Sequence, residues 1–286
     1  MDAPAVPAAS DTSSIERPGV SASTGRPEDG TPTLELRGID KSFGAVQVLH
    51  GVDMKVYPGQ VTALVGDNGA GKSTLIKSIA GIHAIDAGEL LFEGKPISIS
   101  GPREAAALGI EIVYQDLALA DNLDVVQNMF LGRERKNGIV LDEISMEQAA
   151  RDTLSKLSVR TLKSVRQLVA SLSGGQRQTV AIAKAVLWES KLVVLDEPTA
   201  ALGVAQTRQV LDLVRRLADT GHAVVFISHN MVDVFEVADR VAALYLGRMA
   251  ADIPISQVNR SQVIELITAG RSGDVGIAAD AAAVEV

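Results

Sequence analysis

The nine residues from Gly66 to Thr74 constrain this chain most, because they read Gly-Asp-Asn-Gly-Ala-Gly-Lys-Ser-Thr. An apolar stretch, residues 61–65, precedes them, and a run with helical character, residues 72–80, follows. A glycine-rich loop between a strand and a helix lets successive backbone N–H groups turn toward one phosphate. The sequence therefore predicts a phosphate-binding loop, which a plain turn at Asn68 and Gly69 would not explain.

Each residue type in this loop has a chemical reason to be there. Gly66, Gly69 and Gly71 lack a Cβ and permit backbone conformations that other residues avoid. The helix that follows directs the positive end of its dipole at the same point. Lys72 is expected to reach the β- and γ-phosphates of a nucleotide, and the Ser73 hydroxyl to contact Mg²⁺. The other nucleotide-binding residues expected in the loop are Asn68, Ala70 and Thr74.

Composition and charge exclude several classes of protein. The chain has 286 residues, 47% of them hydrophobic, and a net charge of −8, so nothing global points to nucleic acid. It has no cysteine, which excludes disulfides, thiolate metal sites and a cysteine nucleophile. No apolar run reaches the roughly 18 residues that a membrane-spanning helix needs, and the N-terminus lacks the pattern of a signal peptide. A role at a membrane would therefore require a partner.

The distribution of apolar residues predicts the domain organisation. Residues 1–32 contain hardly any large apolar side chain and are expected to form a disordered N-terminal tail. The ordered domain is expected over residues 33–270, beginning with an alternating strand at residues 33–39. Residues 116–175 are mostly helical in pattern and predict an inserted helical subdomain. Residues 271–286 are rich in Ala, Gly and Asp and are expected to be loose.

The remaining segments predict an α/β fold. Strands are expected at residues 33–39 and 46–54, and the strand with a glycine-containing turn at 86–97 indicates an antiparallel hairpin. The apolar segments at 192–196 and 223–228 are typical of strands that are buried on both faces of a parallel sheet. Further strands are expected at 110–115 and 240–246, and further helices at 102–108, 177–188 and 204–218.

Several candidate functional residues follow predicted strands or begin a helix. Asp196 and Glu197 end an apolar strand, at the edge where ligands lie in open parallel sheets. Ser173, Gly174, Gly175 and Gln176 begin a helix, so their hydroxyl, N–H groups and helix dipole form a second candidate anion site. On position alone, His229 could equally be a capping or loop histidine, and Phe43 could be a core residue. These last two positions stay open until the motifs are considered together.

In this order and spacing, the motifs resemble the nucleotide-binding subunit of an ATP-binding-cassette (ABC) transporter over residues 33–270. The resemblance implies a P-loop NTPase fold of the ABC-ATPase type, with a mainly parallel core sheet, an antiparallel β subdomain and a helical subdomain. It also implies ATP and Mg²⁺ as cofactors. Phe43 would stack on adenine, and Gln115 would contact the metal or the attacking water. Asp196 would hold Mg²⁺, Glu197 would polarise the water, and His229 would contact the γ-phosphate.

The segment Leu172 to Gln176 reads Leu-Ser-Gly-Gly-Gln, which in the resembling family is the signature motif. There the signature of one subunit closes over the ATP on the phosphate-binding loop of another. Because this chain carries each motif once, the resemblance implies a homodimer or pairing with a second such subunit. One position departs from the family pattern: Gly203 stands where an aspartate is usual, which affects a contact across the dimer. We expect hydrolysis to survive this change.

Residues 123–134 resemble a segment of monosaccharide importers. Residues 172–197 and the Ala-Ala-Leu-Gly at 200–203 resemble the single-cassette members of that fructose, ribose and xylose branch. The leading hypothesis is therefore an ATPase subunit that energises sugar import at the cytoplasmic face of the inner membrane. Its partners would be transmembrane permease subunits and, indirectly, a sugar-binding protein, with no nucleic acid. The alternatives are a cassette for another solute, a soluble ABC ATPase without a transport role, and a nucleotide-binding switch that hydrolyses little ATP.

Overall fold

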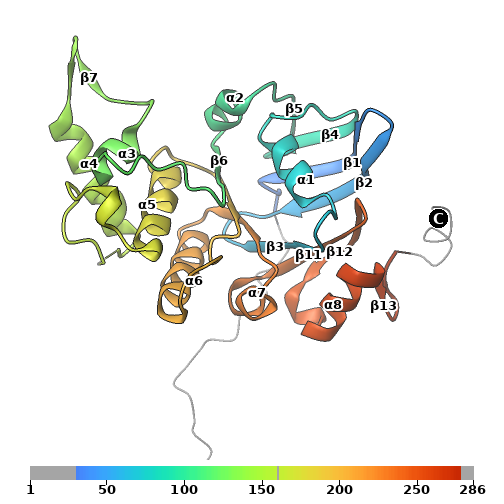
Figure 1. Ribbon diagram of the computed structural model, residues 1–286. Coiled ribbons are helices and arrows are strands. Elements are labelled where there is room, and N and C mark those ends of the chain that lie inside the picture. The colour runs from blue at the N-terminus through green and yellow to red at the C-terminus, as the bar shows by residue number, and fades with distance from the viewer. Residues whose placement is uncertain (1–29, 160, 278–286) are drawn as a thin grey trace, which may run out of the picture.

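The computed structural model describes residues 30–159 and 161–277, which form a core sheet, an antiparallel sheet and a helical subdomain (Figure 1). The tail expected at residues 1–32 lies outside the described residues except for 30–32, and residues 278–286 also lie outside them. None of the described helices is long and apolar enough to cross a membrane. The α/β prediction with a mainly parallel core sheet is confirmed.

The core sheet has six strands in the order β12-β11-β3-β10-β9-β6, all parallel except β12, which is antiparallel to β11. Every residue of β3 and of β10 is buried, as their continuous apolar sequences predict. The parallel strands therefore bring the loops at their carboxyl ends to one edge of the sheet. The strands are β3 (Val61–Gly66), β6 (Ile110–Val113), β9 (Leu192–Asp196), β10 (Ala223–Ile227), β11 (Arg240–Tyr245) and β12 (Arg248–Pro254).

Helices and the second sheet cover the two faces of this core sheet. Along β9, Val193 and Leu195 pack with the cluster that contains α5 to α8, whereas Leu192 and Val194 pack with α1 and the antiparallel sheet. This alternation follows from the two-residue period of a strand. The sequence predicts α1 and α6 but not α7 or α8. The helices are α1 (Lys72–Ile79), α2 (Pro102–Ala107), α6 (Val204–Asp219), α7 (Met231–Val237) and α8 (Arg260–Ala269).

The antiparallel sheet has the strand order β2-β1-β4-β5 and packs over α1 (Figure 1). The hairpin of β1 and β2 ends with Phe43 opposite Val46, next to a tight turn in which Gly44 has φ 61°. The strands are β1 (Leu34–Phe43), β2 (Val46–Val56), β4 (Ala87–Phe92) and β5 (Lys95–Ile97).

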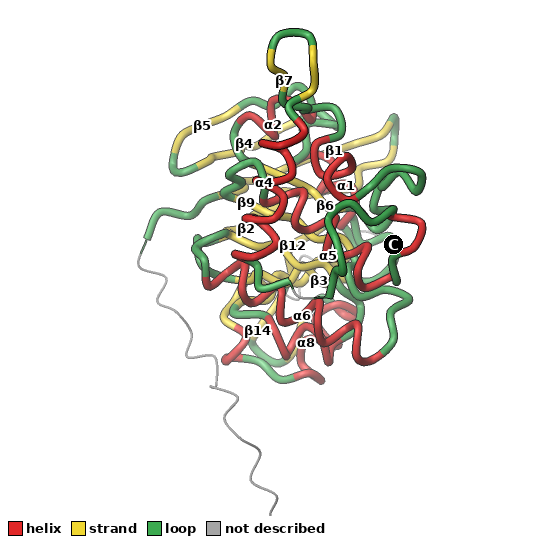
Figure 2. The backbone as a smooth tube through the Cα atoms, turned by 90° about the vertical axis from the view of Figure 1, so that its left-hand side faces the viewer, coloured by secondary structure: helices red, strands yellow, loops and turns green. Residues whose placement is uncertain are grey.

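The region expected to be mostly helical contains less helix than predicted. Between α3 and α4, a small hairpin of β7 and β8 projects from the molecule (Figure 2). The two residues of its turn are Gly138 and Ile139, and Gly138 has φ 66°, a left-handed value that glycine adopts readily and that tight hairpin turns require. The elements are α3 (Val125–Phe130), β7 (Lys136–Asn137), β8 (Val140–Leu141), α4 (Glu143–Lys156), a 3-10 turn (Val169–Ser171) and α5 (Gly174–Val186).

The described end of the chain also differs from its prediction. Residues 271–277 were expected to be loose, but β13 (Arg271–Ser272) and β14 (Val275–Gly276) pair as a short hairpin. Val275 and Ile277 pack against the main hydrophobic cluster, which explains the order of this segment. A 3-10 turn (Ile255–Gln257) precedes α8.

Candidate functional site

A cleft of about 400 Å³ lies where the loop before α1 meets the carboxyl ends of β6 and β9. It brings together most of the residues that the sequence predicts for phosphate and metal binding. The lining residues are Val48, Asn68, Gly69, Gly71, Lys72, Ser73, Thr74, Gln115, Asp196 and Glu197.

The glycines of the loop have two different structural roles. Gly69 and Gly71 have φ values of 84° and 104°, so they adopt the left-handed conformation that the sequence predicts for them. Gly66 does not adopt it. A Cβ at Gly66 would lie 2.5 Å from the carbonyl oxygen of Leu244 on β11. Gly66 is therefore required by the close approach of two backbone segments, and our prediction of a special backbone conformation at this position was wrong.

Backbone hydrogen bonds hold the loop in place from both sides. The Ala70 N–H donates to the Asp67 oxygen at 3.1 Å, and the Ala70 oxygen accepts from the Gly247 N–H at 3.0 Å. Ala70 is buried, so it anchors the loop and its side chain does not line the cleft.

Lys72 lies across the loop that precedes it. Its ammonium donates to the carbonyl oxygens of Gly66, at 2.7 Å, and Asp67, at 3.0 Å. Burial lowers the pKa of Lys72, while the charges of three nearby carboxylates, with Glu197 first, act in the opposite direction. The lysine is thus held at the cleft by the same loop whose N–H groups are expected to face phosphate.

Asp196 and Glu197 place two carboxyl groups at the end of β9. Burial raises the pKa of Asp196, and the neighbouring charge of Glu197 adds to this effect. The Glu197 N–H donates to the Ile227 oxygen at 3.1 Å, which continues the pairing with β10. Glu197 has φ 48°, an uncommon value for a residue with a Cβ. The chain therefore turns sharply at Glu197 directly after the buried strand.

His229 does not line the cleft, but its side chain contacts Glu197, which does. Its Nδ1 lies 3.2 Å from the Glu197 Oε1, and 73% of its side chain is exposed. The loop around it is held by Asn230, whose N–H donates to the Ser228 hydroxyl at 3.0 Å. The Asn230 side chain also caps α7 by accepting from the Val232 N–H at 2.9 Å. This fixed turn explains how an exposed histidine is presented beside Glu197.

Phe43 is not a core residue, because 44% of it is exposed. It ends β1 opposite Val46, and Val48, two residues further along β2, lines the cleft. Phe43 therefore lies beyond the rim of the cleft, on the side of the antiparallel sheet.

The signature residues lie apart from the cleft. Ser173 caps the N-terminus of α5, accepting from the Gln176 N–H at 3.4 Å, and its own N–H donates to the Gln176 side chain at 2.9 Å. Gln176 also donates to the Thr161 oxygen at 2.6 Å. Ser173 is exposed, and the four residues from Ser173 to Gln176 are absent from the cleft lining. A single chain thus holds two separate candidate anion sites.

The signature glycines have a packing role that the sequence did not reveal. A Cβ at Gly175 would lie 3.0 Å from the Cβ of Gln206, and a Cβ at Gly174 would lie 3.1 Å from the Leu202 side chain. Both neighbours belong to the start of α6 or to the turn before it. The glycines therefore let α5 approach α6 closely.

Sequence reasoning missed two residues beside the acids. Tyr114 is half-buried, and both burial and the charge of Asp196 raise its pKa. Its position directly before Gln115 was the available signal. Thr199 donates to an Asp233 carboxylate oxygen at 2.7 Å and so ties the turn after Glu197 to α7. Asp233 is on a helix that the sequence did not predict.

Comparison with known proteins gives consistent matches. The family model described as ABC transporter matches residues 49–200. The Sulfolobus acidocaldarius xylose/arabinose import ATP-binding protein XylG is 45% identical over 244 residues, which cover 85% of this chain and 97% of that protein. The Rhizobium meliloti fructose import ATP-binding protein FrcA is 47% identical over 247 residues, covering 84% and 95%.

Longer relatives and solved structures match as well. The Yersinia pestis ribose import ATP-binding protein RbsA is 40% identical, over 82% of this chain but only 46% of its own length. The crystal structure of an ATP-binding cassette of an ABC transporter in its ADP conformation has a TM-score of 0.71 and 28% identity, covering 83% of this chain and 95% of that one. A nucleotide-free cassette gives a TM-score of 0.70 at 25% identity, with the same two coverages.

Proposed function

This chain belongs to the ABC transporter family as an ATP-binding ATPase subunit, and from that premise we propose that it powers the import of a monosaccharide. We infer the substrate class from the 45% and 47% sequence identity to two monosaccharide import proteins, each of which is matched over nearly its whole length. Membrane permease subunits follow as partners, because the relatives are the ATP-binding proteins of import systems.

The cleft is proposed to hold the triphosphate of ATP. The N–H groups of Gly69 and Gly71 and the start of the α1 helix dipole suit an anion. The Lys72 ammonium is already held at the cleft and would exchange its carbonyl partners for the β- and γ-phosphates. Phe43, exposed beyond the rim, would stack on the adenine ring.

The lining residues also fit Mg²⁺. The Ser73 hydroxyl, the Gln115 side chain and the Asp196 carboxylate provide the hard oxygen ligands that this ion prefers. Burial, with the neighbouring charge of Glu197, raises the pKa of Asp196, and a bound cation would favour its ionised form. When bound, Mg²⁺ neutralises charge on the β- and γ-phosphates.

Glu197 is proposed to orient the water that attacks the γ-phosphorus and to accept its proton as ADP leaves. A carboxylate directly after the metal ligand and at the mouth of the cleft suits this role. His229, with Nδ1 3.2 Å from Glu197, would hold Glu197 in position and contact the γ-phosphate.

A second copy of the chain is proposed to complete each ATP site. Ser173 at the exposed N-terminus of α5 can bind an anion, yet it does not line the cleft of its own chain. In a head-to-tail homodimer, this end of α5 would close over the ATP held by the partner's phosphate-binding loop. Hydrolysis would remove the γ-phosphate between the two subunits and let them separate.

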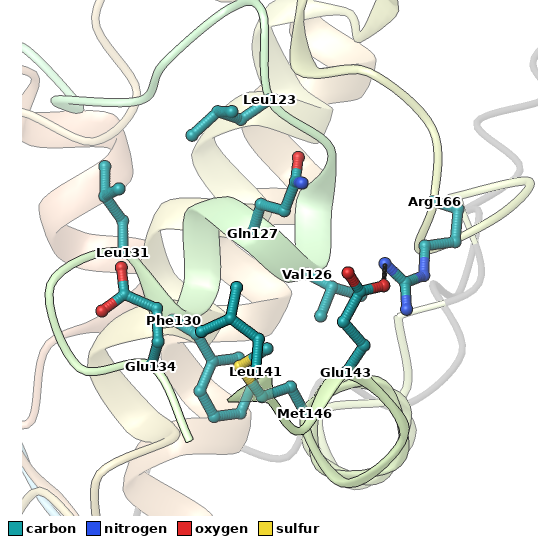
Figure 3. A pocket seen from close by; sticks show the side chains of 10 residues that line it. All are labelled: Leu123, Val126, Gln127, Phe130, Leu131, Glu134, Leu141, Glu143, Met146 and Arg166. Carbon is teal, nitrogen blue, oxygen red and sulfur yellow. Dashed lines mark ion pairs between the residues drawn. The ribbon is translucent and has the colours of Figure 1, made fainter. Parts of the chain in front are cut away.

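The permease is proposed to dock in an apolar groove of about 170 Å³ in the helical subdomain (Figure 3). Phe130 and Leu131 from the end of α3, Leu141 from β8 and Met146 from α4 line it. Arg166 on its edge pairs with Glu143 at 3.1 Å. Docking here would hold the subunit at the cytoplasmic face of the inner membrane and couple it indirectly to a sugar-binding protein.

Uptake of labelled fructose, ribose, xylose, galactose and arabinose by the native host tests this function. Cells with Lys72→Ala in place of the wild-type chain should lose uptake of one or two of these sugars. Unchanged uptake of all five, with the variant expressed and no redundant transporter, would contradict a sugar importer. It would favour another solute or a role without transport.

A further inference from the structure

The segment that follows α1 is attached to the end of β1, where Phe43 lies. The Asp86 carboxylate accepts from the Lys41 ammonium and from the Ser42 N–H, each at 2.6 Å. The Asp86 N–H in turn donates to the Asp40 oxygen at 2.9 Å. Three consecutive residues before Phe43 are therefore held by one aspartate, which lies more than 40 positions later in the chain.

His83, in the same segment, contacts the Phe43 ring directly. The two ring centroids are 5.0 Å apart, and the ring planes meet at 80° in an edge-to-face arrangement. The Lys41 ammonium lies 5.4 Å from the centroid of the same phenylalanine. The His83 N–H donates to the Lys77 oxygen of α1 at 3.2 Å, so its backbone is fixed to the end of that helix.

The two ends of α1 therefore lie near the two parts of ATP, the phosphates at one end and the base at the other, in the proposed binding mode. Lys72, at the start of α1, lines the cleft proposed for the phosphates, and the segment after α1 contacts the side chain proposed for the base. Phe43 is exposed at a hairpin end, where no core packing sets its orientation. An exposed ring that samples several rotamers loses entropy when it stacks, and a neighbour that restricts it beforehand reduces that loss.

We infer that His83 and Asp86 are positioning residues for the nucleotide base, which hold Phe43 where it can stack on adenine. The inference rests on the proposed function, in which ATP lies in the cleft and Phe43 meets its base. In the ion pair of Asp86 with Lys41, 43% of the Asp86 side chain is accessible and 12% of the Lys41 side chain. A pair with one exposed partner contributes modestly to the stability of the fold, so we expect base binding to respond to its removal.

Calorimetric titration of the full-length chain with ATP and with inorganic tripolyphosphate separates base binding from phosphate binding. His83→Ala and Asp86→Ala should each raise the Kd for ATP about three- to tenfold and leave the Kd for tripolyphosphate unchanged. Phe43→Ala should raise the Kd for ATP about tenfold or more. His83→Phe, which keeps a ring, should bind ATP like the wild type. Glu93→Ala removes an exposed ion pair with Lys191 and is the matched control.

A double variant tests whether His83 acts through Phe43. If it does, Phe43→Ala combined with His83→Ala should bind ATP no more weakly than Phe43→Ala alone. The inference is overturned if His83→Ala and Asp86→Ala bind ATP like the wild type while Phe43→Ala does not, or if they weaken tripolyphosphate equally. Unchanged ATP affinity in Phe43→Ala would also overturn the inference. The proposed nucleotide site itself fails, and this inference with it, if Lys72→Ala leaves both ligands bound.

Discussion

Two glycine-containing motifs lie at helix N-termini, and their surroundings differ: the first loop precedes α1, and the second loop, Leu172 to Gln176, runs into the start of α5. The first loop shares its cleft with a lysine, a serine and two carboxyl groups. The second offers an exposed serine cap, and its glycines pack against α6 and the turn before it. The comparison teaches that a glycine-rich helix start does not by itself indicate catalytic groups nearby. In this chain those groups come from neighbouring strands, which end beside the first loop and not beside the second.

Removing the acid beside the first loop tests this difference most strongly. Glu197→Gln should lower the rate of ATP hydrolysis about 100- to 10,000-fold, because the proposed general base is lost. ATP binding should persist, and the variant should accumulate as an ATP-bound dimer. Phosphate release, ATP titration and size-exclusion chromatography measure the three effects, with Glu93→Gln as the control. Normal turnover in Glu197→Gln would remove this residue from the proposed role.

Mixing two inactive variants asks whether the second loop acts on the partner's ATP. Ser173→Arg blocks the second loop and Lys72→Ala disables the first, so each homodimer should be inactive. In a mixed dimer, one composite site is intact. An equal mixture should therefore recover about one quarter of wild-type ATPase activity if the two sites act independently. No recovery in verified mixed dimers would count against the proposed sandwich.

Replacing one glycine in each loop with alanine compares how much space the two sites leave for a Cβ atom. Gly66→Ala places a Cβ 2.5 Å from a backbone oxygen of β11 and should lower the free energy of unfolding by about 3 kcal/mol. Gly175→Ala meets the Gln206 side chain at 3.0 Å and should lower it by about 1 kcal/mol, because α6 can shift slightly. Urea unfolding of both variants measures the difference. Equal losses would show that the two glycines are constrained alike.

The raised pKa of Asp196 predicts a small dependence on pH of the stability of the folded chain without nucleotide. Burial raises the pKa of Asp196 in the folded state, so ionised Asp196 disfavours folding once the pH exceeds the ordinary aspartate pKa. Asp196→Asn should therefore unfold at a higher urea concentration than the wild type at pH 7.5. This difference should shrink as the pH falls through the raised pKa of folded Asp196, and it should vanish below the ordinary value of 3.8, where Asp196 is protonated in both states. The measurement requires a chelator, and a constant difference across the pH range would contradict the argument.

The sequence predicted much of this arrangement because the first loop, the apolar strands and the acids are local patterns. Buried strands of the core sheet appear as continuous apolar runs, and a parallel sheet brings their carboxyl ends to one edge. The prediction for Gly66 failed because the oxygen it approaches belongs to Leu244, far along the chain. The contact of His83 with Phe43 is likewise a tertiary contact, which no local pattern encodes.

Helical segments were predicted less well for a different reason. The short helix α7 is defined by its Asn230 cap, whereas the hairpin of β7 and β8 depends on a two-residue turn within a region of mixed pattern. Sequence signals of only one or two residues, such as a helix cap or a tight turn, are harder to recognise beside longer segments with a clear helical periodicity. Gly138, at the first position of the two-residue turn, is the local signal for the hairpin, and it lies within a region whose overall pattern is helical.

The hydrogen bonds from Lys72 to the carbonyl oxygens of Gly66 and Asp67 bear on how fast a nucleotide can bind. They hold the loop around its own lysine, so we expect the proposed phosphate-binding conformation to be preformed. Association would then require little more than an exchange of partners at one ammonium group. For such a preformed site, the on-rate is governed by diffusion and orientation, and differences in affinity among nucleotides arise chiefly from their residence times.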